Sequence, residues 1–205
     1  MVIVKLLLTI VLASMLMDGQ DMSLRVDRAV TPSHPVRAIA GGVAVIQMDM
    51  HGDPEMMATS ILEGEVPFVT AAMNALTHWA FSAPPNASVA RTSVTFFFRP
   101  QSPYPMKVLK KPVSPWSVHE DRPALPIEAI DPGYPMMSSS EGVVIFEVGV
   151  AVDGRVTYLE TVHGIAGLTE HASHAVKNWK FSPASIAGKP VPSSAIVAIS
   201  FVSPI

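Results

Sequence analysis

Hydrophobic and polar positions alternate along the segment 144–152, which has an apolar side chain at every even position. A period of two, carried mostly by β-branched and aromatic residues, predicts a strand with one buried face. Asp153-Gly154 follows, a dipeptide typical of two-residue hairpins, because a type I′ turn needs positive φ at both central residues. We therefore expect residues 156–162 to return as a second strand.

The hydrophobic period then changes to helical spacing. From Leu168 to Trp179, apolar residues recur three and four positions apart, and polar residues fill the positions between them. This pattern predicts an amphipathic helix. Pro183 and the turn Gly188-Lys189-Pro190 end it, and the segment 195–202 has the composition of a third strand.

The same order of patterns occurs one hundred residues earlier in the chain. The residues repeated at this spacing include Gly42 and Gly142, Gly64 and Gly164, Ala72 and Ala172, Ala75 and Ala175, Trp79 and Trp179, and Phe81 and Phe181. A spacing held over this length predicts a duplicated domain. We expect an α+β fold of two tandem small domains, at 31–100 and 131–205. Each would be a three-stranded antiparallel sheet packed by one main helix, in the order β-β-α-β.

Two segments lie outside the copies. Residues 101–130 are rich in proline and predict an extended linker, which either lies against a domain surface or docks a partner. Residues 1–19 combine Lys5 with an apolar run shorter than the ~20 residues of a membrane-spanning helix. This pattern predicts a signal peptide or a retained N-terminal anchor, and therefore export to the periplasm.

The composition and the absence of certain motifs exclude several classes of function. The chain has 205 residues, a formal net charge of −3, scattered Lys and Arg, and no cysteine. It therefore lacks the basic footprint of a nucleic-acid-binding protein and can form neither disulfides nor thiolate metal sites. Ser138-Ser139-Ser140 has no Gly-x-Ser-x-Gly context, and no glycine-rich phosphate loop occurs. We expect no enzyme activity and no cofactor.

Three histidines near the second helix allow two interpretations. His171 and His174 are three residues apart, and His163 precedes them. Helical spacing of three can present two imidazoles to one metal ion. A solvated helix face explains the same residues more simply, and the metal site is kept as the alternative.

The landmarks of the second copy point to a known family. They are Asp131-Pro132-Gly133-Tyr134-Pro135, Gly142 before a Val-rich strand, Asp153-Gly154-Arg155-Val156, Gly164, and Trp179-Lys180-Phe181-Ser182-Pro183-Ala184. In this order and spacing, the segment resembles the C-terminal domain of TonB. The first copy resembles a degenerate version of it, with His34-Pro35 in place of Tyr-Pro.

The resemblance implies a periplasmic domain that binds an extended segment at the plug of an outer-membrane transporter by adding it to its sheet. Force from the inner-membrane motor proteins ExbB and ExbD then reaches the transporter. An exposed terminal strand suits this role, because its unpaired N–H and C=O groups can pair with another strand. The partner-binding residues expected from the resemblance are Tyr134, Pro135, Ala195, Val197, Ile199 and Phe201.

Two departures keep a second hypothesis open. The N-terminal apolar run is short for a membrane anchor, and only about a dozen residues separate it from the first copy. The alternative is an envelope scaffold or interaction protein without energy transduction, which pairs with itself, as in a homodimer, or with another periplasmic chain. In both hypotheses we expect the second copy to bind the partner and the first to position it.

Overall fold

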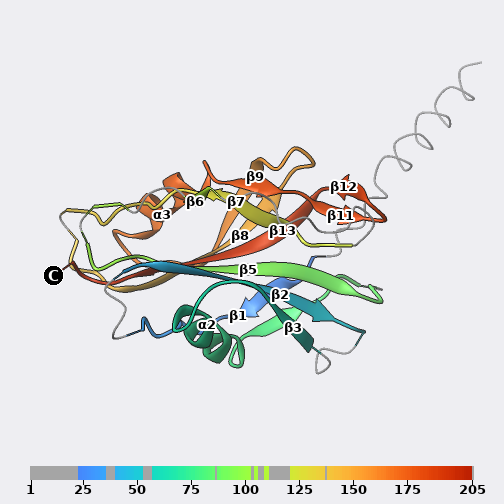
Figure 1. Cartoon of the computed structure of the whole chain (residues 1–205), viewed down its shortest axis with the longest axis horizontal. Helices are drawn as coiled ribbons and strands as arrows, with labels where there is room; N and C mark the ends of the chain where they lie inside the picture. Colours follow the sequence, from blue (N-terminus) through green and yellow to red (C-terminus); the bar gives the residue numbers. More distant parts are fainter. Residues whose placement is uncertain are drawn as a thin grey trace, which may run out of the picture.

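A six-stranded sheet organises the chain (Figure 1). In spatial order its strands are β3 (Met57–Glu63), β2 (Gly42–Met50), β5 (Ala90–Phe98), β13 (Ser193–Phe201), β8 (Gly142–Val150) and β9 (Val156–His163). The computed structural model describes residues 23–35, 40–52, 57–85, 87–102, 104–105, 109–110, 121–136 and 138–204. The predicted signal peptide or anchor at 1–19 lies outside the described residues.

The long elements of each copy follow one another as strand, strand, helix and strand, with shorter strands between the helix and the last strand. The first copy runs β2, β3, α2 (Phe68–Leu76) and β5, and the second runs β8, β9, α3 (Thr169–Val176) and β13. Both helices end three residues before their tryptophan, because the last turn tightens. The amide of Trp79 donates to the carbonyl of Leu76, and that of Trp179 donates to Val176.

The fold is α+β as expected, but the strands do not form two separate sheets. The two terminal strands, β5 and β13, lie side by side at the centre and pair in parallel, whereas all the other neighbours are antiparallel. Both terminal strands are buried along almost their whole length, on both faces. A strand that is apolar on both faces has to be covered on both, so it belongs in the middle of a sheet.

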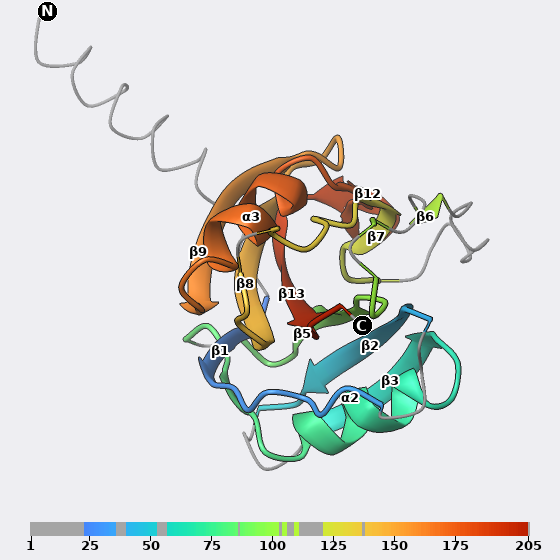
Figure 2. The same ribbon diagram turned by 90° about the vertical axis from the view of Figure 1, so that its left-hand side faces the viewer.

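The two copies are related by an approximate two-fold axis along the strands. A rotation about this axis keeps β5 parallel to β13 and exchanges the faces of the sheet. Accordingly, α2 and α3 cover opposite faces (Figures 1 and 2).

Two small sheets of short strands, which the sequence analysis did not predict, lie beside the large sheet. One pairs β1 (Arg25–Arg28) with β4 (Ala80–Ser82). The other joins β7 (Leu125–Ala129) to β10 (Lys180–Ser182) and to β6 (Leu109–Lys110). Because β4 and β10 follow their helices at equivalent positions, β1 and β7, which lie before residues 31 and 131, occupy equivalent places in the two halves. The end of the predicted linker is strand β7.

Each of these pairs packs across the copy boundary. Pro126 and Ile127 of β7 face Val43 and Val45 of the first copy across a small cavity. Val26 of β1 belongs to the same apolar cluster as residues of β8 and β13. Each copy therefore covers part of the sheet contributed by the other.

The second copy has one insertion. The predicted turn at Gly188 joins β11 (Ala184–Ile186) to β12 (Lys189–Val191), and Ala187 and Gly188 have φ of 49° and 75°. Two successive positive φ values are what a tight hairpin turn requires. In the first copy, β4 leads to β5 through fewer residues.

The hairpin at Asp153-Gly154 is present, but its turn is not the predicted type I′. Gly154 has a φ of 80°, whereas Asp153 does not have a positive φ. The amide of Gly154 donates to Ala151, and the carbonyl of Gly154 accepts from the amide of Phe181. The turn is thus shaped by its contact with β10, which local sequence does not reveal. Two hydrogen bonds from Arg155, one from its backbone amide and one from its guanidinium, lower the pKa of the Asp153 carboxyl.

Candidate functional site

The strand expected to bind a partner is a central strand. Ala195, Val197, Ile199 and Phe201 were predicted on a free edge, but β13 pairs with β8 on one side and with β5 on the other. None of the four side chains is more than 1% exposed. The prediction of an edge strand is therefore wrong, and the physical reason is the apolar character of both faces of β13.

The first copy supplies the strand next to β13. The parallel pairing runs from Ile196 opposite Val94 to Ser200 opposite Phe98. Phe97 of β5 packs against Trp179 of the second copy, with ring centroids 5.7 Å apart. Strand β5 thus occupies the position in which the resemblance places an extended partner segment.

Tyr134 is buried in the core of the second copy, and Pro135 lies beside it. The ring of Tyr134 is 7% exposed and its hydroxyl donates to the carbonyl of Ser140 at 2.9 Å. Its centroid lies 6.5 Å from that of Phe201. Pro135 beside it is half-buried. This segment closes one end of the second core.

A buried ion pair joins the two copies at the same end. Arg99, which follows β5, pairs through Nε with Oδ1 of Asp131, and both side chains are 0% exposed. Asp131 also accepts from the amide of Gly133 at 2.8 Å, and the guanidinium carbon of Arg99 lies 5.6 Å from the ring centroid of Phe201. No local pattern in the sequence predicts this pair, because Arg99 and Asp131 belong to different copies.

In the described part of the chain, the free edges of the large sheet are β3 and β9. Strand β9 pairs only with β8, and most of its side chains are exposed. Tyr158 of β9 lies over Gly149, where a Cβ would approach the ring to 2.1 Å, and its hydroxyl donates to Glu147 at 3.0 Å. The tyrosine is still 44% exposed.

The opposite edge, β3, has the sequence MATSILE, without Lys, Arg or Pro. Ile61 on it is 56% exposed. Charged residues and proline are the usual protection of an edge against pairing with another chain. Strand β3 carries Glu63 at its end and one register shift against β2, and β9 carries Glu160 and two register shifts against β8.

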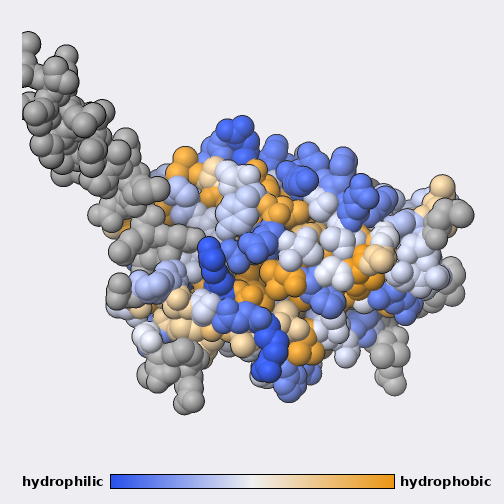
Figure 3. Space-filling model, turned by 180° about the vertical axis from the view of Figure 1, so that it is seen from behind, coloured by the Kyte–Doolittle hydropathy of each residue, from blue (hydrophilic) through white to orange (hydrophobic). Residues whose placement is uncertain are grey.

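Apolar side chains also reach the surface on the side toward which β9 lies. Figure 2 shows β9 and β8 on the rear side of the molecule as it is drawn in Figure 1. Seen from behind, apolar side chains reach the surface in several patches near the middle of this face, with polar side chains between them (Figure 3).

The histidines do not assemble a metal site. His171 and His174 line a groove of about 640 Å³ along α3, together with Glu170 and Asn178. Among the described residues there is no group of three or more His, Asp or Glu side chains that could hold a metal ion.

The helices of the described segments are also too short or too polar to cross a membrane.

The described residues thus form one six-stranded sheet, in which β5 and β13 lie at the centre and β3 and β9 at the edges. Residues 131–202 match the family model described as Gram-negative bacterial TonB protein C-terminal. This part of the chain belongs to the TonB C-terminal domain family, as its landmarks suggested. The family is one of transport-related envelope proteins. Neither the curated proteins nor the solved structures include a significant match to the chain.

Proposed function

We propose that the protein is a periplasmic TonB-type binding module that acts in envelope transport and adds an extended segment of an envelope partner to strand β9. The partner class is an outer-membrane transporter or another periplasmic chain. The observation that carries the proposal is that β13 already pairs with a strand on both sides. A partner segment can therefore be added only at a free edge of the sheet.

Strand β9 is favoured over β3 because it belongs to the segment that matches the family. An added strand gains main-chain hydrogen bonds from the edge and side-chain contacts from alternate residues. The exposed ring of Tyr158 offers such a contact, and Gly149 beneath it fixes the ring in place.

The test uses the whole exported protein and a fluorescent peptide from the plug segment of an outer-membrane transporter. Successive N–H groups of an edge strand point alternately to the neighbouring strand and to solvent. We expect peptide binding to slow amide exchange at the solvent-directed N–H groups of β9 and to leave β3 unchanged. Protection of β3 alone would show that the first copy is the binding edge and contradict the proposal.

A proline variant provides the matched pair. Leu159 and Glu160 are neighbours on β9, so the amide of one points to β8 and that of the other to solvent. Of these two residues, the one whose amide hydrogen exchanges faster in the free protein has its N–H directed to solvent. Replacing that residue by proline removes a donor that only the bound peptide would use. We expect peptide affinity to fall at least tenfold, whereas the equivalent change at Thr59 or Ser60 of β3 leaves it unchanged.

The parallel pairing of β5 with β13 also favours a second candidate, a scaffold without energy transduction. In this scaffold the last strands of the two copies pair with each other, and the free edges of the sheet pair with those of a second molecule. Sedimentation of the exported protein separates the candidates. A stable dimer that protects β9 and excludes the peptide supports the scaffold, and a monomer that binds the peptide supports the module.

A further inference from the structure

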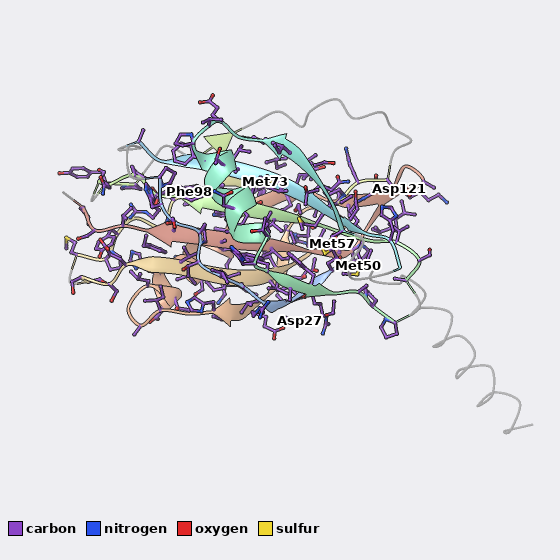
Figure 4. The ribbon with its side chains drawn as sticks, turned by 90° about the horizontal axis from the view of Figure 1, so that it is seen from below. Asp27, Met50, Met57, Met73, Phe98 and Asp121 are labelled. Carbon is purple, nitrogen blue, oxygen red and sulfur yellow. The ribbon has the colours of Figure 1, made fainter. Side chains whose placement is uncertain are left out.

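A cavity of about 380 Å³ opens at the end of the sheet where the β11·β12 hairpin meets the beginnings of β5 and β7. Cavities of this size are typical of small-molecule sites. Figure 4 shows Asp121, which lines the cavity, at the same end of the sheet as Met50 and Met57. The hairpin that forms one wall is the insertion specific to the second copy.

Arg122 is the central cation of this cavity. Its backbone is fixed by two hydrogen bonds of 3.0 Å with Ser185 of β11, one in each direction. Its side-chain Nε is buried and has no hydrogen-bond partner, and no ion pair of Arg122 is present among the described residues. A buried guanidinium donor without an acceptor is costly, so this position favours the binding of an acceptor from outside.

A second polar atom in the wall lacks a partner. The hydroxyl of Ser193, where β13 begins, is buried and makes no hydrogen bond in the described structure. Arg91, the other arginine of the wall, is already engaged by the carboxylate of Asp49 and by the backbone carbonyl of Asp121. Among the described lining residues, the buried side-chain donors without a hydrogen-bond partner are therefore Nε of Arg122 and the hydroxyl of Ser193.

The remaining wall is mainly apolar. It includes Val89, Pro123, Ile186, Val191 and Pro192. A ligand that fills the cavity would bury a hydrocarbon portion here while its polar group meets Arg122. Burial of each CH₂ group of that portion would strengthen binding further.

We propose that this cavity binds a small monoanionic carboxylate with a short apolar chain. The guanidinium of Arg122 would donate to the carboxylate oxygens, and the Ser193 hydroxyl would donate a further hydrogen bond. A single negative charge is favoured over the double charge of a phosphate, because Asp121 also lines the cavity and Asp49 already neutralises Arg91. The site is independent of β9 and of peptide binding.

The test compares octanoate with 1-octanol and with inorganic phosphate by calorimetry and by NMR chemical-shift mapping on the whole protein. We expect octanoate to bind and to shift the resonances of the cavity, octanol to bind at least tenfold more weakly, and phosphate not to bind. In Arg122→Gln, octanoate affinity should fall about tenfold or more, as expected for one lost charge-assisted interaction. Ser193→Ala should reduce it severalfold.

Arg155→Gln is the matched control, because Arg155 is exposed, pairs only with Asp153 in the described structure, and lies outside the cavity wall. Its octanoate affinity should equal that of the unmodified protein. Arg122→Lys keeps the charge and should retain part of the affinity, which separates charge recognition from a packing defect. Equal binding of octanoate and octanol would reduce the site to an apolar cavity. Phosphate binding, or no binding of octanoate at millimolar concentration, would overturn the proposal.

Discussion

The indole Nε1 of Trp179 donates a hydrogen bond of 2.9 Å to the carbonyl oxygen of Ile130. In the first copy, Trp79 makes the equivalent bond to Val30 at 2.7 Å. In both copies the tryptophan follows the helix and its partner lies in the segment that leads into the copy. The duplication therefore preserves a tertiary hydrogen bond that ties the end of each helix to the beginning of its own copy.

Replacing either tryptophan by phenylalanine tests this bond. Trp79→Phe and Trp179→Phe keep an aromatic ring but leave a carbonyl without its donor, and each should reduce the free energy of unfolding by about 1–3 kcal/mol. Because the two cores share one sheet, urea denaturation followed by circular dichroism should show a single transition in both variants. Separate transitions for the two copies would contradict a shared fold.

The ion pair between Arg99 and Asp131 should be sensitive to the loss of one partner. Asp131→Asn leaves the buried guanidinium without its counter-charge, and we expect the free energy of unfolding to fall by about 3–5 kcal/mol. The measurement is the urea midpoint at neutral pH. Asp153→Asn, which removes an exposed carboxylate paired with Arg155, is the control and should leave the urea midpoint nearly unchanged.

A double variant separates the charge from the packing. Arg99→Met with Asp131→Leu removes both buried charges, and apolar replacements of a buried pair are often neutral or stabilising. We expect this variant to recover most of the stability that Asp131→Asn loses. If the double variant were as unstable as the single one, the hydrogen bond from Gly133 to Asp131 would be the more important interaction.

Elements with strong periodicity could be predicted from the sequence. The alternation in β8, the helical stripe ending near Trp179, and the hundred-residue repeat are local or self-similar signals, so they identify the strands, the helices and the duplication. The family landmarks also lie within one copy. They identify the domain, but they do not reveal that a strand of the other copy pairs with it.

The features that decide the candidate site are not local. The parallel pairing of β5 with β13 joins residues about one hundred positions apart, and the β1·β4 and β7·β10 pairs are only a few residues long. Strand β13 has the same pattern of apolar residues whether it ends a three-stranded sheet or lies in the middle of a six-stranded one. Pairing with β5 on its second side excludes it as an edge, and Ile196 and Ala198 on its other face pack in the core of the first copy.

Two glycines with similar backbone angles but different surroundings provide a further test. Gly154 has a φ of 80°, and a Cβ there would lie 1.9 Å from the carbonyl oxygen of Phe181. Gly133 has a φ of 73°, with nothing within 4 Å of a Cβ. Gly133→Ala should cost about 1–2 kcal/mol for the left-handed backbone alone. Gly154→Ala should cost clearly more, because the contact with β10 also has to open. Equal thermal midpoints for the two variants would show that the turn is not held by β10.

The strongest test of the joined sheet is to produce the two halves separately. The fragment 121–205 keeps β7 and its pairing with β10, but it exposes one side of β13 and leaves Trp179 without Phe97. The fragment 23–102 likewise exposes β5, whose side chains are buried on both faces. We expect each fragment alone to be poorly folded or to self-associate through its uncovered strand.

Mixing the fragments should then restore the native state. An equimolar mixture is expected to sediment as a 1:1 complex and to regain slow amide exchange in β5 and β13, because the parallel ladder and the Arg99–Asp131 pair form again between the chains. A fragment 121–205 that is monomeric, fully folded and indifferent to its counterpart would show that the two copies are independent. In that case β13 would again be available as the edge for a partner strand.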